Sequence, residues 1–303
     1  MKQVRVYYAG IPVRNNKEEK KLVLQYFHQG VTLQGQSKEI TQATWEPADL
    51  AVLQGWVHKD SGRTPHLNFR RHVIESQKKI GKHTLIIDSN LFLYADMSNS
   101  KHYLRFSLND VFPSTGVYFT RVIDKNRWLK ISNDLNIKLK PWRKSGNHIL
   151  ICLQRNGGWS MKGIDVCEWC NKVIKRLRKL TDRPILIRKH PGDKKIKINQ
   201  IKGVNVRFSS APNIKFDLEN AWATITFNSS PGVASAIEGI PVFVLDPLNQ
   251  DSQAFDIANF DLHKIDNPNL PDRQNWIEKI SMCHFNFDDL KNGVAWNIIK
   301  EYI

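Results

Sequence analysis

Short apolar runs alternate with segments of helical periodicity along the whole sequence. Such alternation is typical of βαβ units, which build parallel sheets covered by helices. The expected strands are residues 4–9, 50–54, 84–88, 148–153, 184–188, 204–208, 223–227 and 241–245. The expected helices are residues 18–29, 70–79, 165–180 and 232–238, followed by a helical tail over residues 274–303.

A polar stretch with one proline and one glycine, residues 141–147, separates the two halves of this pattern. Its composition is that of an interdomain linker. We therefore expect an α/β fold of two Rossmann-like domains facing each other across a cleft, residues 1–145 and residues 146–303. The last helix is free in this scheme to pack back on the first domain.

Ligands of open parallel sheets bind beyond the carboxyl ends of the strands. Three loops of the second half at such positions are rich in groups that bind phosphate: glycines that allow close approach, cations, a histidine and hydroxyls at a helix start. A tight turn is the alternative for the first loop, and helix capping is the alternative for one serine of the third. The expected donor-side residues are Arg155, Asn156, Gly157, Arg188, His190, Gly192, Lys194, Asn228, Ser229, Ser230 and Gly232.

Two of these loops resemble motifs of GT-B glycosyltransferases. His190-Pro191 and, about forty residues later, Ser229-Ser230 are similar to the "HP" and "SS" motifs of the bacterial capsule Kdo- and sialyltransferase group. The resemblance implies a GT-B fold, with both loops binding the nucleotide and phosphate of a sugar-nucleotide donor. Ala234 stands where the capsule enzymes commonly have Glu, which implies a different recognition of the donor.

The first half carries the candidates for acceptor binding and for the catalytic base. Asp88 and the downstream residues 116–119 resemble a capsule-transferase segment whose acidic residue is the base, and helix capping is the alternative role for Asp88. The loop after the second expected strand adds His58 and Asp60 as alternative catalytic groups. The expected acceptor-binding residues are Trp56, His66, Arg70 and Arg71.

Composition changes the picture mainly through charge. The formal net charge is +16 and the isoelectric point about 9.7, which favours a polyanionic partner such as nucleic acid, an anionic membrane surface or an acidic polymer. Cationic pairs recur along the chain, for example at residues 70–71, 78–79 and 175–176. No apolar run approaches the ~20 residues that span a bilayer, and the first residues lack the features of a signal peptide, so we expect a cytoplasmic protein.

Four cysteines are too few for a disulfide framework in a chain of 303 residues. Cys167 and Cys170 form a C-x-x-C pair without the second pair of a zinc site, so we expect structural free thiols. No D-x-D carboxylate pair follows an expected strand. We therefore predict transfer without a metal or other cofactor, with cations stabilising the leaving phosphate.

Residues 141–160 extend the resemblance to phage proteins grouped with DNA base glycosyltransferases, including arabinosyltransferases that modify 5-hydroxymethylcytosine. This resemblance implies a UDP-sugar donor, a pentose such as arabinose among the sugars, and a hydroxymethylated DNA duplex as acceptor in the cytoplasm of a host cell. Two alternatives stay open: a capsule-type transferase using a CMP-activated acidic sugar, and a non-catalytic DNA-binding protein on the same fold.

Overall fold

A computed structural model describes residues 1–12, 17–58, 61–92, 103–246 and 250–303. These residues form two compact units, Met1–Asn136 with Ile277–Ile303, and Ile137–Trp276. The units thus divide at 136/137 and 276/277, whereas the sequence alone suggested one boundary at 145/146. The difference at the first boundary has a local cause. The backbone N–H groups of Lys140 and Arg143 donate to the carbonyls of Ile237 and Gly239, so this stretch belongs to the second unit.

The first unit is built on a six-stranded sheet with the order β11-β5-β4-β3-β1-β2. Strands β1 to β4 are parallel, and β5 and β11 are antiparallel to their neighbours. The elements are β1 (Gln3–Tyr7), α1 (Lys17–Thr32), β2 (Gln36–Ile40), β3 (Leu50–Gln54), α2 (Pro65–Lys79), β4 (His83–Asp88), β5 (Leu104–Leu108), α3 (Lys125–Leu135), β11 (His284–Phe285), α8 (Phe287–Lys291), α9 (Val294–Ile299) and η5 (Lys300–Tyr302). Helix α7 (Gln274–Ser281) runs across the boundary between the two units.

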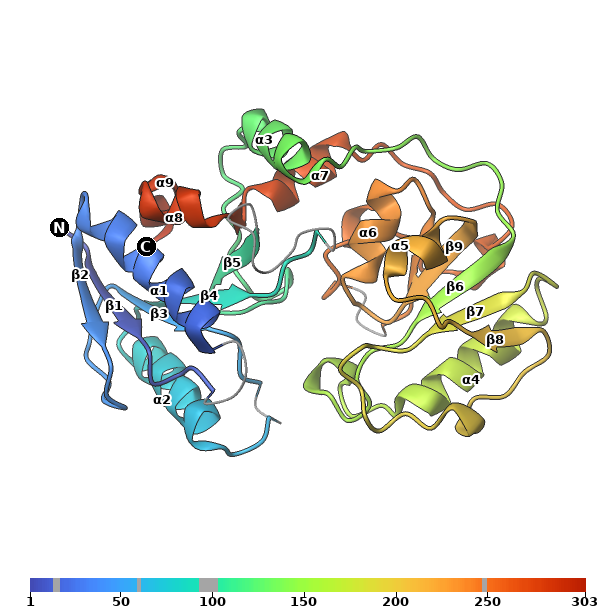
Figure 1. The fold of residues 1–303 in the computed structure, drawn as a ribbon, viewed down its shortest axis with the longest axis horizontal. Helices are drawn as coiled ribbons and strands as arrows, with labels where there is room; N and C mark the ends of the chain where they lie inside the picture. The colour runs from blue at the N-terminus through green and yellow to red at the C-terminus, as the bar shows by residue number, and fades with distance from the viewer. Residues whose placement is uncertain (13–16, 59–60, 93–102, 247–249) are drawn as a thin grey trace. The chain divides into compact units, whose positions relative to one another are not determined.

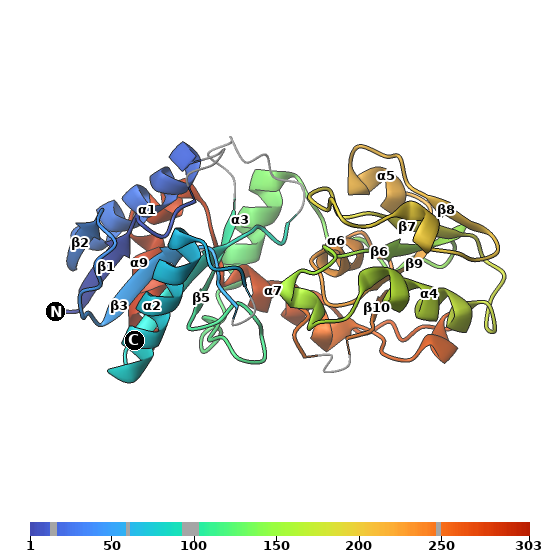
Figure 2. The ribbon, with the colours of Figure 1, turned by 90° about the horizontal axis from the view of Figure 1, so that it is seen from below.

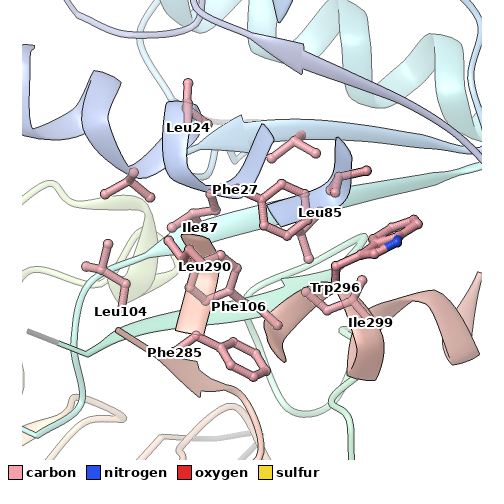
Figure 3. Packing of buried hydrophobic residues seen from close by; sticks show 14 of the residues in the cluster. Leu24, Phe27, Leu85, Ile87, Leu104, Phe106, Phe285, Leu290, Trp296 and Ile299 are labelled. Atoms are coloured by element: carbon pink, nitrogen blue, oxygen red, sulfur yellow. The ribbon is translucent and has the colours of Figure 1, made fainter. Parts of the chain in front are cut away.

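Helix α1 and the C-terminal helices cover one face of this sheet, and α2 covers the other (Figures 1 and 2). The alternation of β1 explains both contacts, since Val4 and Val6 point into the α1 core while Tyr7 meets Phe69 of α2. Figure 3 shows Phe27 of α1 in the first core, with Phe106 of β5 at 6.3 Å between ring centroids. The tail is an integral part of this core, to which it contributes Phe285, Leu290, Trp296 and Ile299 (Figure 3).

The second unit is built on a five-stranded, fully parallel sheet with the order β10-β9-β6-β7-β8. Helix α4 lies on one face, and α5 and α6 lie on the other (Figure 1). Its elements are β6 (His148–Cys152), η1 (Trp159–Met161), α4 (Val166–Leu177), β7 (Ile185–Arg188), η2 (Ile198–Gln200), β8 (Val206–Phe208), α5 (Ile214–Leu218), β9 (Ala221–Thr226), α6 (Pro231–Ile237), β10 (Val242–Val244), η3 (Phe255–Ile257) and η4 (Leu262–Lys264).

The α/β fold class expected from the sequence is confirmed, and most expected strands lie within a few residues of their predicted bounds. All four cysteines are free and buried, as expected. Among the helices of the described ranges, none combines the length and apolar character that crossing a membrane requires. The strands β2 and β5, the helix α3 and the short strand β11 inside the tail were not anticipated.

Candidate functional site

The three phosphate-type loops lie together because the strands that precede them end level. Cys152 of β6 is in register with Arg188 of β7 on one side and with Thr226 of β9 on the other. All three strands run parallel, so the loops after them emerge side by side at the carboxyl edge of the second sheet. The parallel topology of this unit thus gathers segments that begin more than seventy residues apart in the sequence, after Cys152 and after Thr226.

Asp193 ties the loop after β6 to the loop after β7. Its Oδ2 accepts the backbone N–H of Asn156 at 2.7 Å, and its Oδ1 accepts those of Lys195 at 2.8 Å and Ile196 at 2.6 Å. Burial works to raise the pKa of this carboxyl, but the three backbone donors hold the pKa below its usual value. Asp193 is therefore an ionised clamp between the two loops.

A second polar network ties the loop after β6 to the loops after β9 and β10. The side-chain oxygen of Gln154 accepts the backbone N–H of Asn228 at 3.2 Å, and the Asn228 amide donates to Asp246 at 2.7 Å. Asp246 is buried and is paired with Lys162 at 2.8 Å, and Lys162 also meets Asp251 at 2.7 Å. Burial opposes the charge on Lys162, yet the two carboxylates raise its pKa above the usual value.

Two cations lie over the backbone that these clamps hold in place. A Cβ added to Gly192 would lie 3.0 Å from Cζ of Arg155, so the Arg155 guanidinium rests against the His-Pro-Gly turn. A Cβ added to Gly157 would lie 3.1 Å from Nζ of Lys195. Arg155 and Lys195 thus each reach from one loop to the other and concentrate positive charge at the edge, with Lys194 exposed beside them.

His190 has one ring nitrogen fixed by its own turn. Its Nδ1 lies 3.0 Å from the backbone N of Gly192 and accepts that N–H, so the proton of the neutral ring is on Nε2. Burial, followed by the charge of Arg155, lowers the pKa of His190 below its usual value. At neutral pH the side chain therefore offers one N–H donor at Nε2.

Ser229 presents a hydroxyl with no hydrogen-bond partner among the described residues, although the oxygen is shielded from solvent. Ser230 occupies the N-cap position of α6 but makes no side-chain cap bond, and Pro231 follows it in the first turn. The Gly232 N–H donates to the carbonyl of Ser229. Buried hydroxyls are nearly always paired in folded proteins, so the Ser229 hydroxyl is suited to bind a ligand atom.

Arg188 is engaged within the second unit. Its Nη1 donates to Asp217 at 2.6 Å and to the carbonyl of Ala211 at 3.1 Å, and Asp217 also accepts the Ser209 hydroxyl at 2.6 Å. Both charged side chains are largely buried, at 13% and 4% exposure. This geometry makes Arg188 a link between the end of β7 and the segment from the loop after β8 to α5. Its contact with phosphate stays a prediction.

In the first unit, Asp88 lies at the carboxyl end of β4 and is paired with a buried arginine. Arg105 of β5 is its cross-strand partner and reaches its Oδ2 at 2.5 Å. The Asp88 side chain is 28% exposed, and its Oδ1 makes no hydrogen bond within the described residues. The ion pair orients the carboxylate and leaves one oxygen available at the sheet edge.

Arg70 and Arg71 of α2 hold the loops around Asp88. The Nε of the buried Arg70 donates to the carbonyl of Gly10 at 2.7 Å, and Nη1 donates to that of Trp56 at 3.4 Å. Arg71 donates to the carbonyl of Ser61 at 3.2 Å. Gly55, with φ of +91°, allows the close approach of Arg70, because a Cβ there would lie 2.6 Å from its Nη1.

The remaining acceptor-side candidates have different surroundings. His58 and Trp56 are half-buried in the same loop, and the indole N–H of Trp56 is shielded without a partner among the described residues. His66 contacts the Thr64 hydroxyl at 3.1 Å, and burial lowers the pKa of its ring. Asp60 lies outside the described residues.

Sequence reasoning missed the carboxylates that hold the donor-side loops. Asp246 is the second residue after β10, so inspection of residues after that strand would have found it. Asp193 reaches Asn156 of another loop, and Asp217 reaches Arg188 and Ser209, which lie earlier in the chain, and no spacing rule identifies these contacts. Within the described ranges, no group of three or more His, Cys, Asp or Glu side chains is arranged to hold a metal ion, and metal independence stays a prediction.

No protein-family model matches the chain, and no curated protein matches it either. Solved structures are similar across its whole length. The chain is similar to the Thermosulfurimonas dismutans KpsC beta Kdo 2,4 transferase, with a TM-score of 0.58 and 14% identity over 97% of this chain and 98% of that one. Similarity to the KpsC beta Kdo 2,7 transferase of that organism gives a TM-score of 0.53 and 9% identity over 99% and 100% of the two chains. At these identities the likeness establishes the fold, which is GT-B.

Proposed function

We propose that the chain is a glycosyltransferase that binds a sugar nucleotide at the carboxyl edge of the second sheet. The observation that carries the proposal is the solvent-shielded hydroxyl of Ser229, which has no hydrogen-bond partner among the described residues and lies beside loops that Asp193 and Gln154 tie together. The cations Arg155, Lys194 and Lys195 and the Nε2–H of His190 supply the remaining donors for a phosphate.

The chemistry follows from these groups. Positive charge at the edge stabilises the negative charge that builds on the nucleotide phosphate as its bond to the sugar breaks. Asp88, oriented by Arg105, takes the proton of the acceptor hydroxyl. The acceptor oxygen bonds to the sugar carbon as the bond from that carbon to the nucleotide phosphate breaks. Because cations take the place of a metal, we expect activity to persist in excess EDTA, and loss on chelation with rescue by Mg²⁺ would contradict this part of the proposal.

The donor site is tested by binding. Ser229→Ala should weaken the binding of UDP or CMP roughly tenfold or more, since a hydrogen bond to a charged group contributes about 1.5–3 kcal/mol. Ser132→Ala is the matched control, because that hydroxyl donates to the Leu129 carbonyl on α3 of the first unit. Calorimetric titration of both variants with a panel of UDP, CMP and GDP sugars identifies the nucleotide. Equal affinities in both variants would place the nucleotide elsewhere.

For the acceptor, we propose 5-hydroxymethylcytosine in duplex DNA, with a UDP-sugar, among them UDP-arabinose, as donor. The net charge of +16 supports a polyanionic acceptor, and the resemblance of residues 141–160 to phage DNA base glycosyltransferases supports this one. Incubation with hydroxymethylated DNA and UDP-sugars should add the mass of one sugar to the nucleoside. Asp88→Asn should abolish that gain, whereas Asp124→Asn, which alters the N-cap of α3, should not.

A second candidate is transfer of a CMP-activated acidic sugar such as Kdo. The fold similarity to two Kdo transferases over nearly the whole chain favours it. Release of CMP from CMP-Kdo, with no mass gain on DNA from any UDP-sugar, would select this candidate. Tight DNA binding without turnover of any donor would instead select a non-catalytic DNA-binding protein on the GT-B fold.

A further inference from the structure

A hollow lies along α4. This helix covers the face of the second sheet opposite α5 and α6 (Figure 1). It has a volume of about 460 Å³, within the range of small-molecule binding sites. Its floor is apolar and consists of Trp169, Val173 and Leu245. None of these residues is among the expected donor-side residues, although Leu245 directly precedes Asp246 of the polar network.

The rim of the hollow is cationic. Lys172, Lys175, Arg176 and Lys179 line it, and no acidic residue does so among the described residues. Lys172 is paired with the exposed Glu168 at 2.7 Å, while the other three cations make no ion pair within the described part of the chain. Lys172 lies about one helical turn before the adjacent Lys175 and Arg176, so these three cations lie close together on α4, and Lys179 follows shortly after the helix ends.

An apolar floor with a cationic rim fits an amphiphilic anion. We propose that the hollow binds an anionic phospholipid of a membrane surface, with its phosphate at the rim and an acyl chain on Trp169 and Leu245. Phosphate attracts Lys and Arg, and their aliphatic stems extend the apolar floor. A nucleic-acid backbone would pair with the rim but would leave the apolar floor without an apolar partner, so the floor favours lipid.

Vesicle binding tests the rim. Co-sedimentation with phosphatidylcholine vesicles that contain phosphatidylglycerol should exceed that with pure phosphatidylcholine. The double variant Lys175→Glu/Arg176→Glu should lower the partition coefficient roughly thirtyfold or more, because each cation near an anionic surface contributes about 1 kcal/mol. Lys78→Glu/Lys79→Glu, in the last turn of α2, makes the same charge change in the first unit and should have little effect.

Fluorescence tests the floor. A phosphatidylglycerol with a brominated acyl chain should quench tryptophan emission, and Trp169→Phe should remove most of that quenching, although eight of the nine tryptophans remain. Three outcomes would overturn the proposal: equal binding to neutral vesicles, equal losses in the two double variants, or quenching that Trp169→Phe does not change. Duplex DNA binding that Lys175→Glu/Arg176→Glu removes, without vesicle binding, would identify a nucleic-acid surface instead.

Discussion

Removal of the Asp193 carboxylate should loosen two donor-side loops at once. Asp193→Ala takes the acceptor away from the backbone N–H groups of Asn156, Lys195 and Ile196, which lie 2.6–2.8 Å from its oxygens. Hydrogen bonds to a charged group contribute about 1.5–3 kcal/mol each, but the three are not additive and the freed N–H groups of an edge loop can bind water. We therefore expect a loss of about 3 kcal/mol in the stability of this part of the second unit.

Two measurements follow this change. Hydrogen exchange should lose protection at the amides of Asn156, Lys195 and Ile196, and the dissociation constant of the bound nucleotide should rise at least tenfold. Asp261→Ala is the matched control, since it removes an exposed cap whose carboxylate accepts the His263 N–H at 3.0 Å. That control should leave nucleotide affinity unchanged.

The effect of pH has a definite sign. The pKa of Asp193 is lowered in the folded chain, so its stabilisation is complete above the ordinary Asp pKa of ~3.9 and is lost as pH falls through the lower folded value. The wild type and Asp193→Ala should therefore differ fully at neutral pH and converge in acid. Unchanged protection of the Asn156 amide in the variant would refute the clamp, and unchanged nucleotide affinity with lost protection would refute its role in donor binding.

Other changes test the remaining contacts. Arg188→Met should destabilise the second unit by about 3 kcal/mol in chemical denaturation, because it leaves the buried Asp217 without its partner; a loss under 1 kcal/mol would contradict a buried ion pair. Gly55→Ala should cost about 1–3 kcal/mol through the positive φ and the contact with Arg70, whereas Gly62→Ala, in open space, should cost almost nothing. The pKa of His190, followed by NMR, should lie below the ordinary ~6.5. The contribution of the neutral ring to stability is therefore complete above that pH and is lost as pH falls through the pKa of the folded chain. A raised pKa would contradict the role of Nδ1 as a hydrogen-bond acceptor.

Periodicity alone was sufficient for the elements whose burial is simple. The central strands β3, β4, β6 and β7 are nearly continuous apolar runs because helices cover both faces of a parallel sheet, and such runs are visible in any sequence. Strand β2, with its exposed Gln36, Lys38 and Glu39, lies at a sheet edge and carries no such signal. The sequence pattern predicts helix throughout the tail, because a strand as short as β11 has no periodicity to detect.

The sequence by itself determined the fold class and the positions of the donor-side loops, since strand ends and the motifs His190-Pro191 and Ser229-Ser230 are local features. Only the tertiary structure decided which members of those loops are available. Arg188 is paired with Asp217, Asn156 is held by Asp193, and the Ser229 hydroxyl has no partner in the part of the chain that the structure describes. The physical reason is that a charge or hydroxyl is committed by its neighbours in space, and parallel strands bring those neighbours from distant parts of the chain.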